Sequence, residues 1–328
     1  MVSRVGIIGC GRIGQVHAAN LAKRTPLVFC SQSGTSARRL QGKHGGDVCD
    51  DITQLINISD VNAVVIATPP DQHVAQVIEC LRAGKSVLVE KPLCTSMAEL
   101  ERIERAAAEA PPGCTAMVAE NYYYKPSLLT MKALIGGGRI GRVRRLQVRK
   151  LTKQQDDGWK SRYGALLEGG IHFVALIAAL IDAALATGSG VPVSPAAVEA
   201  DFPTRTAGQD QAERHSVTRL QYEDAAGDLT ASLHYAWDVP SLLRGTFQHS
   251  QIEGDAGRIV FESNGLYMYH GARFIKRVRG PQLGDLMGYG AMTNDFLACL
   301  ADPKRQPYSN LARARRDLAV VFAAYGER

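Results

Sequence analysis

The sequence has few features of a membrane or exported protein. Its longest apolar run, residues 173–186, contains Asp182 and falls short of the roughly 20 residues that a membrane-spanning helix needs. The apolar run near the start, residues 5–9, is too short and too rich in glycine for the core of a signal peptide. We therefore expect a buried helix at 173–186, no membrane partner and a cytoplasmic location.

Residue patterns that bind metal ions or form disulfide frameworks are also missing. The seven cysteines are scattered and no two form a C-x-x-C pair, so most of them are expected to be small buried hydrophobic residues. Four histidines of the second half lie on separate segments without the spacing of metal ligands, so we expect no metal: His215, His234, His249 and His270.

The charge is nearly balanced. There are 38 Lys and Arg against 32 Asp and Glu, which gives a net charge of +6 and permits an anionic ligand. Residues 139–153 hold seven basic residues and no acid, but their alternation is typical of the exposed face of a strand. We therefore expect no nucleic-acid partner. With 328 residues and 45% hydrophobic residues, the chain is long enough for about two domains, and disorder, coiled coil and collagen are excluded.

The first domain, expected at 1–121, follows an alternating pattern of strands and helices. Short β-branched runs alternate with helical patterns, which is typical of a doubly wound parallel sheet of the Rossmann type, with six strands expected. Asp71 is expected to cap a helix over 72–82, and Ser96 with Glu99 forms a capping box. The strand-like runs are 5–8, 27–29, 61–67, 87–89 and 115–118.

The second domain, expected at 122–328, has a different pattern. After a helix at 127–135, strand-like segments predict an open, largely antiparallel sheet, and helices return at 290–300 and 310–324. The overall class is thus α/β followed by α+β. Helices cover only one face of such a sheet, so we expect a homodimer or homotetramer through the other. The predicted strands are 143–151, 197–201, 215–222, 229–235, 248–253 and 258–262.

A glycine motif follows the first strand and opens a helix. Gly9, Gly11 and Gly14 match G-x-G-x-x-G, with Arg12 and Ile13 between the last two glycines. In this context Gly9 makes the tight turn, Gly11 lets the backbone approach a pyrophosphate, and Gly14 allows close helix packing. The phosphates would lie at the helix N-terminus, so the motif predicts a dinucleotide site.

The choice of dinucleotide depends on the end of the second strand. An NAD-binding protein normally places an acid there, whereas this chain has Ser31 and Ser33, with Arg38 and Arg39 soon after. Hydroxyls and a guanidinium accommodate a 2′-phosphate, which favours NADP(H) over NAD(H). The alternative is that both arginines are simply solvated on the next helix.

Three further segments carry a resemblance. They read IATPPDQH (66–73), GKSVLVEKP (84–92) and EGGIH (168–172). Together with the glycine motif they closely resemble the glucose-fructose oxidoreductase, inositol dehydrogenase and MocA (Gfo/Idh/MocA) family over nearly the whole chain. The resemblance implies that Thr68, Pro69 and His73 line the cofactor and that Glu90 and Lys91 lie near the nicotinamide ribose. It also implies that Lys91 and the acid-histidine pair, here Glu168 and His172, supply proton transfer.

The same residues have a rationale of their own. Pro92 restricts Lys91 to an extended or turn backbone just after the fifth strand, at the edge of the sheet where ligands bind. A desolvated ammonium there can orient a substrate oxygen and exchange a proton with it. Glu168 and His172 are four residues apart, so on an α-helix they share a face. The alternatives are a solvated surface lysine and a purely structural pair.

The chain also departs from the family pattern. Glu168 stands where the family usually has aspartate, and Arg162-Tyr163-Gly164 keeps only the last residue of a triple glycine. Arg162 and Tyr163 would narrow the pocket, and Tyr163 is an alternative proton donor. Tyr122 and its two neighbouring tyrosines lie at the domain junction, where they either contact a ligand or only pack.

These patterns predict an NADP(H)-preferring oxidoreductase that moves a hydride between the nicotinamide and a carbonyl or alcohol carbon. The substrate is expected to be a sugar, a cyclitol or a similar small molecule, with Lys91 and His172 handling the proton and Glu168 orienting one of them. Two alternatives remain open. One is a glycoside-cleaving enzyme that oxidises its substrate transiently, and the other is a non-catalytic NADP(H) sensor.

Overall fold

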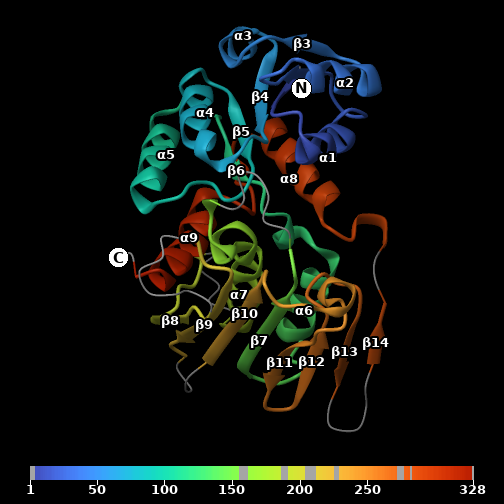
Figure 1. Cartoon of the computed structure of the whole chain (residues 1–328), viewed down its shortest axis with the longest axis vertical. Helices are drawn as coiled ribbons and strands as arrows, with labels where there is room; N and C mark the ends of the chain where they lie inside the picture. Colours follow the sequence, from blue (N-terminus) through green and yellow to red (C-terminus); the bar gives the residue numbers. More distant parts are fainter. Residues whose placement is uncertain are drawn as a thin grey trace. The chain divides into compact units, whose positions relative to one another are not determined.

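The computed structural model describes residues 4–154, 162–185, 191–203, 212–224, 229–271, 277–280 and 283–326. The chain divides into two compact units, one formed by residues 1–120 and 289–315 and the other by 121–288 and 316–328. Figure 1 shows the elements of each unit, and each unit is described by itself.

The first unit is built on a six-stranded parallel sheet. Its strand order is β3-β2-β1-β4-β5-β6, the order of the doubly wound dinucleotide fold, which confirms the predicted class. Helix α8 of this unit packs against α1, although it comes late in the sequence. The strands are β1 (Arg4–Ile8), β2 (Leu27–Cys30), β3 (Asp47–Cys49), β4 (Val61–Ile66), β5 (Ser86–Val89) and β6 (Ala116–Val118). The helices are α1 (Arg12–Leu21), α2 (Thr35–His44), α3 (Ile52–Asn57), α4 (Pro70–Arg82), α5 (Met97–Glu109) and α8 (Tyr289–Ala301).

Two predicted helix starts have different outcomes. The Ser96 hydroxyl accepts a hydrogen bond from the Glu99 amide at 3.2 Å, which confirms the predicted cap, while the Glu99 carboxylate reaches back to the Thr95 amide, 2.8 Å away and one residue before the N-cap. The predicted cap at Asp71 is wrong, because α4 begins at Pro70 and Asp71 lies inside its first turn. Proline fits the first helical position, since it lacks only an amide hydrogen that would be unpaired there.

The second unit contains an eight-stranded, largely antiparallel sheet, as predicted. Its order is β14-β13-β12-β11-β7-β10-β9-β8, and β7 and β10 form a parallel pair in the middle. The strands are β7 (Val143–Leu151), β8 (Ala197–Asp201), β9 (His215–Tyr222), β10 (Leu229–Ala236), β11 (Ser250–Gly254), β12 (Gly257–Phe261), β13 (Met268–Gly271) and β14 (Arg277–Arg279). The helical segments are η1 (Asn121–Tyr124), α6 (Pro126–Gly136), η3 (Leu166–Gly170), α7 (Ile171–Leu185), η4 (Leu242–Gly245) and η5 (Leu283–Asp285). The division between the units falls inside α9 (Leu311–Ala324).

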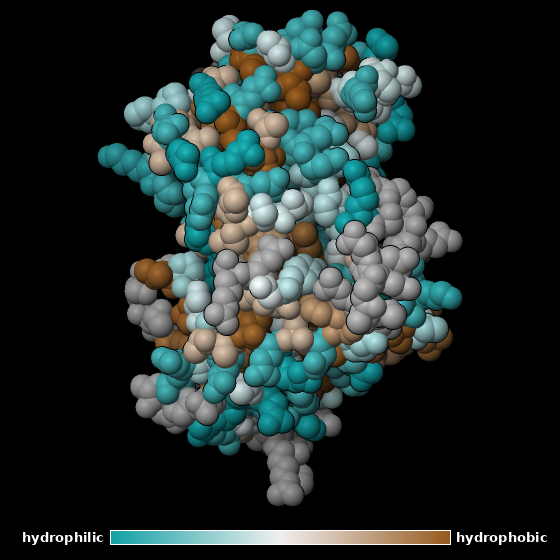
Figure 2. Space-filling view, turned by 60° about the vertical axis from the view of Figure 1, so that its left-hand side comes forward, coloured by the Kyte–Doolittle hydropathy of each residue, from teal (hydrophilic) through white to brown (hydrophobic). Residues whose placement is uncertain are grey.

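Helix α7 forms the core of the second unit. It packs against β7 and β10 on one side and against α6 on another (Figure 1). Its residues 173–181 are all buried. The expected buried helix at 173–186 forms, but it starts earlier than the apolar run: η3 and α7 together make a helical segment, Leu166–Leu185, that by length and composition alone could cross a membrane. Its most apolar window is 83% buried inside the protein, which is typical of a core helix. On the face drawn in Figure 2, hydrophobic residues form small groups among hydrophilic ones.

Candidate active site

The glycine motif lies where the strand order of the first sheet reverses. β1 and β4 are neighbours there, and Gly9 follows β1 with φ of +92°. A Cβ atom on Gly9 would lie 2.5 Å from the Ala67 carbonyl oxygen, and one on Gly14 would lie 2.0 Å from the Gly9 carbonyl oxygen. Side chains are therefore sterically excluded at both positions, and the loop and α1 can pack closely. No described atom lies within 4 Å of the corresponding position on Gly11, which leaves room for a ligand.

The N-terminus of α1 opens from this loop. Gly11 is its N-cap and makes no side-chain capping bond, and the exposed Arg12 and half-buried Ile13 form its first turn. The first amide groups of a helix point outward and carry partial positive charge, which attracts phosphate. The glycine loop of residues 9–14 and this helix N-terminus, together called the glycine cradle, therefore fit the pyrophosphate of a dinucleotide.

Ser31 begins the loop that follows β2. Its hydroxyl accepts hydrogen bonds from the Ser36 hydroxyl at 2.9 Å and the Ala37 amide at 3.2 Å, so it satisfies an amide in the first turn of α2, whose N-cap residue is Gly34. Ser33 and Arg38 are exposed nearby, and a Cβ atom on Gly34 would lie 3.0 Å from the Arg38 guanidinium. This loop thus presents a hydroxyl and a guanidinium at the position where an NAD-binding protein carries an acid.

His73 connects the ends of two strands. Its Nδ1 lies 2.8 Å from the Pro92 carbonyl oxygen and its Nε2 lies 2.9 Å from the Thr68 carbonyl oxygen. The ring is fully buried, and this burial lowers the pKa of His73. His73 would therefore affect a bound cofactor only through the backbone of Thr68 and Pro92, which it holds in place. Thr68 and Pro69 are half-buried and line the edge of the sheet directly.

Glu90 is held in place by a histidine that sequence reasoning missed. His17 of α1 is buried, and its Nε2 donates a hydrogen bond of 2.8 Å to Glu90 Oε1. Glu90 Oε2 accepts one from the Lys91 amide at 3.2 Å, so α1 and the end of β5 are tied together. Lys91 itself is half-buried, and its peptide bond to Pro92 is cis. The only sequence signal for His17 is its place on the helix that follows the glycine motif.

In the second unit, Glu168 lies in a π-helix and not in an α-helix. The π-turn Leu166–Gly170 runs directly into α7, where His172 is the second residue. A Cβ atom on Gly169 would lie 2.1 Å from the hydroxyl of Tyr235, so this glycine lets the wide turn pack against β10. The chain therefore changes from π-helical to α-helical geometry between Glu168 and His172. Single π-turns of this kind within helices are frequent at functional sites. Glu168 is buried and His172 is half-buried.

Tyr235 of β10 lies against the π-turn and supports it. Its hydroxyl accepts a hydrogen bond from Trp237 Nε1 at 2.8 Å. Burial raises the pKa of Tyr235, and the charge of Glu168 raises it further. Tyr235 therefore stays neutral at physiological pH and serves as a structural partner of the turn.

Glu213 anchors the start of the same π-turn. Its Oε1 accepts hydrogen bonds from the Leu166 amide at 2.7 Å and the Tyr325 hydroxyl at 2.9 Å. A Cβ atom on Gly164 would lie 1.7 Å from Glu213 Oε2, which explains why this residue of the triple glycine is kept. Arg162 is exposed and Tyr163 is half-buried.

We expect Gly164→Ala to destabilise the protein by about 1–3 kcal/mol, because the new methyl group overlaps the Glu213 carboxylate. Gly42→Ala is the matched control: Gly42 lies inside α2 with no described atom near its Cβ position, so alanine should be neutral or stabilising there. Urea unfolding of both variants measures the difference. Equal stability of the two variants would contradict the claim that Gly164 is needed to make room for the Glu213 carboxylate that anchors the π-turn.

Metal-binding groups of three or more His, Cys, Asp or Glu side chains are not found among the described residues. His215 and His234 lie on separate strands, as the sequence indicates, but pairing of β9 with β10 brings His215 Nε2 to 2.7 Å from His234 Nε2. Cys30 and Cys49 likewise are direct neighbours on β2 and β3. All seven cysteines are free thiols.

The fold and the glycine cradle define a two-unit protein with a dinucleotide-binding Rossmann unit. Residues 3–119 match the model of the oxidoreductase family with the NAD-binding Rossmann fold, Gfo/Idh/MocA. The family resemblance inferred from the motifs is thus confirmed over residues 3–119, the part of the chain that matches this family's model.

Several named relatives are dehydrogenases or reductases. An inositol 2-dehydrogenase of Saccharopolyspora erythraea is 33% identical over 150 residues, 44% of this chain and 43% of the relative. A dTDP-3,4-didehydro-2,6-dideoxy-alpha-D-glucose 3-reductase of Actinomadura kijaniata is 30% identical over 52% of this chain and 53% of the relative. The aligned region thus spans about half the length of these curated relatives.

Solved structures resemble the whole chain. A 3-ketoreductase from Actinomadura kijaniata, in complex with NADP and TDP-benzene, has a TM-score of 0.80 at 19% identity and covers 100% of this chain and 98% of that one. The WlbA dehydrogenase from Bordetella pertussis, in complex with NADH and UDP-GlcNAcA, has a TM-score of 0.76 at 22% identity, with 99% and 96% coverage. At these identities the likeness establishes the two-unit fold.

Proposed function

We propose that this protein is an NADP(H)-preferring oxidoreductase that interconverts a carbonyl and an alcohol on a sugar, a cyclitol or a sugar-like compound. The observation that carries the proposal is the glycine cradle at the β1/β4 switch point, with Lys91 following β5 at the same edge of the sheet. Relatives named as inositol dehydrogenases and sugar 3-reductases support the substrate class. The free thiols support a cytoplasmic location.

In this mechanism the chemistry of a nicotinamide held here would be to supply or accept the hydride. The cradle and the N-terminus of α1 would bind the pyrophosphate, and Arg38 with Ser31 and Ser33 would bind a 2′-phosphate. Lys91 and His172 orient the substrate oxygen and exchange a proton with it, in the direction that the reaction requires. Glu168, held in the π-turn, orients one of these two groups.

A substrate panel tests the proposal. The protein is incubated with NADP⁺ and polyols, or with NADPH and the matching ketoses and ketocyclitols, while absorbance at 340 nm is followed. We expect stoichiometric cofactor conversion with at least one compound. Sugar release without cofactor conversion would instead favour the glycoside-cleaving alternative, and tight NADPH binding without any turnover would favour a sensor.

We further propose that two copies or four copies of the chain associate through the open face of the second sheet. Helix α7 covers one face, while the other carries exposed or half-buried polar side chains on adjacent strands, among them Gln147, Arg219, Gln221 and Ser232. An uncovered sheet face is a favourable surface for isologous pairing.

Light scattering at micromolar concentration is therefore expected to give two or four times the 35.4 kDa mass of one chain. Thr230→Glu together with Ser232→Glu places two like charges side by side on this face and should shift the mass towards that of a single chain. A single-chain mass for the unmodified protein would contradict the prediction.

A further inference from the structure

The imidazole of His172 is stacked on an aromatic ring. The ring centroids of Tyr122 and His172 are 4.7 Å apart, and the planes differ by 15°. Phe173 approaches the same tyrosine edge-on, with centroids 5.2 Å apart. Tyr122 itself is only 5% exposed, so its ring forms a fixed wall against one side of the half-buried histidine.

Tyr122 is in turn fixed by a turn that follows β12. Its hydroxyl donates a hydrogen bond to Asn264 Oδ1 at 3.1 Å. The turn is shaped by Glu262, whose Oε2 accepts hydrogen bonds from the Asn264 amide at 2.9 Å and the Leu266 amide at 3.3 Å. Glu262 is 1% exposed, so these contacts are made away from solvent.

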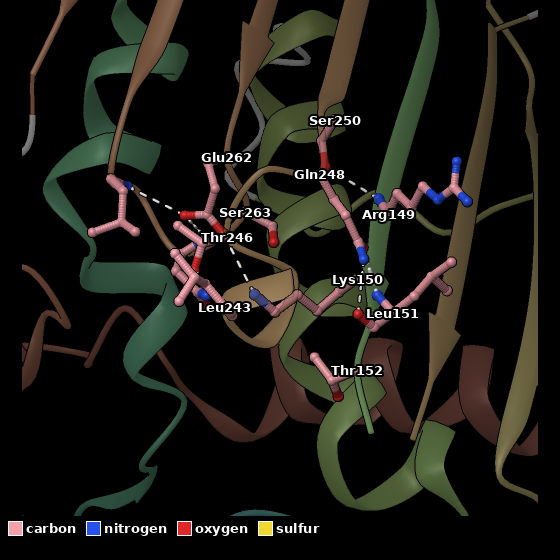
Figure 3. Close-up of polar contacts among 12 residues, drawn as sticks. Arg149, Lys150, Leu151, Thr152, Leu243, Thr246, Gln248, Ser250, Glu262 and Ser263 are labelled. Carbon is pink, nitrogen blue, oxygen red and sulfur yellow. Dashed lines mark hydrogen bonds and ion pairs between the residues drawn. The ribbon is translucent and has the colours of Figure 1, made fainter. Parts of the chain in front are cut away.

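Buried charges surround the same turn. Lys150 reaches from β7 across to Glu262, with Nζ 3.4 Å from Oε1 (Figure 3), and burial lowers the pKa of this lysine. Lys125 is fully buried, with Nζ 4.1 Å from the centroid of the Tyr122 ring and 3.5 Å from the Ser263 carbonyl oxygen. Burying three ionisable groups is costly unless they hold one another in a defined geometry. The cluster of Lys125, Lys150 and Glu262 therefore supports Tyr122 in a fixed position.

We propose that Tyr122 is a positioning residue that fixes the plane of the His172 imidazole, and that the turn containing Glu262 and Asn264 holds Tyr122 in this role. The proposal rests on the proposed function, in which His172 exchanges a proton with the substrate oxygen. An imidazole has a broad preference for rotation about its last side-chain torsion, so an unsupported ring samples many orientations. Stacking restricts that rotation, and a misplaced group of this kind costs a reaction up to about 100-fold in rate.

A spectroscopic experiment tests the positioning without any substrate. A ring stacked on tyrosine feels its ring current, so the Cε1–H NMR signal of His172 should be shifted upfield in protein with ¹³C-labelled histidine, with His172→Gln used for assignment. Tyr122→Leu should abolish the shift and Tyr122→Phe should retain it. Asn264→Ala should reduce it, because Tyr122 loses its anchor. An unchanged signal in Tyr122→Leu would overturn the proposal.

Kinetics give the second readout. Tyr122→Leu should lower kcat about 10- to 100-fold with KM changed less than about twofold, and Tyr122→Phe should restore most of the rate. Tyr123→Phe is the matched control, because it removes a buried hydroxyl that is bonded to Asp317 and Arg316 and belongs to the same short helix. It should lower stability and leave kcat and the His172 signal unchanged.

The two experiments separate the possible failures. If the protein turns over no substrate, the proposed function is wrong, and the NMR signal alone decides whether Tyr122 orients His172. If turnover is normal in Tyr122→Leu although the signal has moved, the orientation of His172 does not matter for the reaction and the positioning role is refuted.

Discussion

Alanine in place of Lys91 or His172 is expected to lower the rate of hydride transfer about 10²- to 10⁴-fold, the usual scale for a lost acid or base group. Lys91 is half-buried, with its backbone amide bonded to the Glu90 carboxylate, and His172 is half-buried against Tyr122, so both residues are held in place. Glu168→Gln should have a milder effect, because it keeps the shape of the side chain inside the π-turn and removes only its charge.

Single-turnover kinetics with NADPH, together with cofactor titration, separates chemistry from binding. NADPH affinity should change little in His172→Ala, since this residue belongs to the second unit and the glycine cradle to the first. Near-normal turnover in His172→Ala would mean that the proton comes from another group, and Tyr163, which is half-buried just before the π-turn, is then the next candidate.

Ser31→Asp should reverse the cofactor preference of the protein. We expect the unmodified protein to bind NADPH at least several-fold more tightly than NADH, because Arg38 and the hydroxyls of the loop suit a 2′-phosphate. An aspartate at position 31 would repel that phosphate and bind the ribose hydroxyl of NADH instead. The variant should fold, since a carboxylate at position 31 can accept the same hydrogen bonds from Ser36 and Ala37, and negative charge is favourable near a helix N-terminus.

Fluorescence titration with both dinucleotides measures this preference. Arg38→Ala should weaken NADPH binding selectively, whereas Lys43→Ala, in the last turn of the same helix, should leave the ratio of the two affinities unchanged. Equal affinity of the unmodified protein for both cofactors, or tighter binding of NADH, would contradict the preference.

The sequence predicted the first sheet well because its signals are local. The glycine motif, the β-branched runs and the Ser96 capping box each lie within a few residues, and the order of the parallel strands follows from the right-handed crossover rule. Strand β3 was not among the predicted runs, since Asp47–Cys49 has only three residues and forms a strand because β2 offers it a free edge.

The arrangement around the candidate site could be predicted only in part. The motifs named Lys91, Glu168 and His172, but nothing near Glu168 signals a π-turn, because the space for that turn is made by Tyr235 on a distant strand. The contact of His17 with Glu90 joins residues 73 positions apart. Such pairs depend on the packing of whole elements, which local patterns do not specify.

Isotope transfer tests the proposed chemistry most directly. The protein is mixed with a carbonyl substrate found in the panel and with NADPH that carries deuterium at the transferred position of the nicotinamide C4. If the protein is an oxidoreductase of this kind, mass spectrometry should find one deuterium per molecule of alcohol product, bound to the former carbonyl carbon, with one NADP⁺ formed for each. A product without deuterium, or conversion of the sugar with no NADP⁺ formed, would contradict direct hydride transfer between cofactor and substrate.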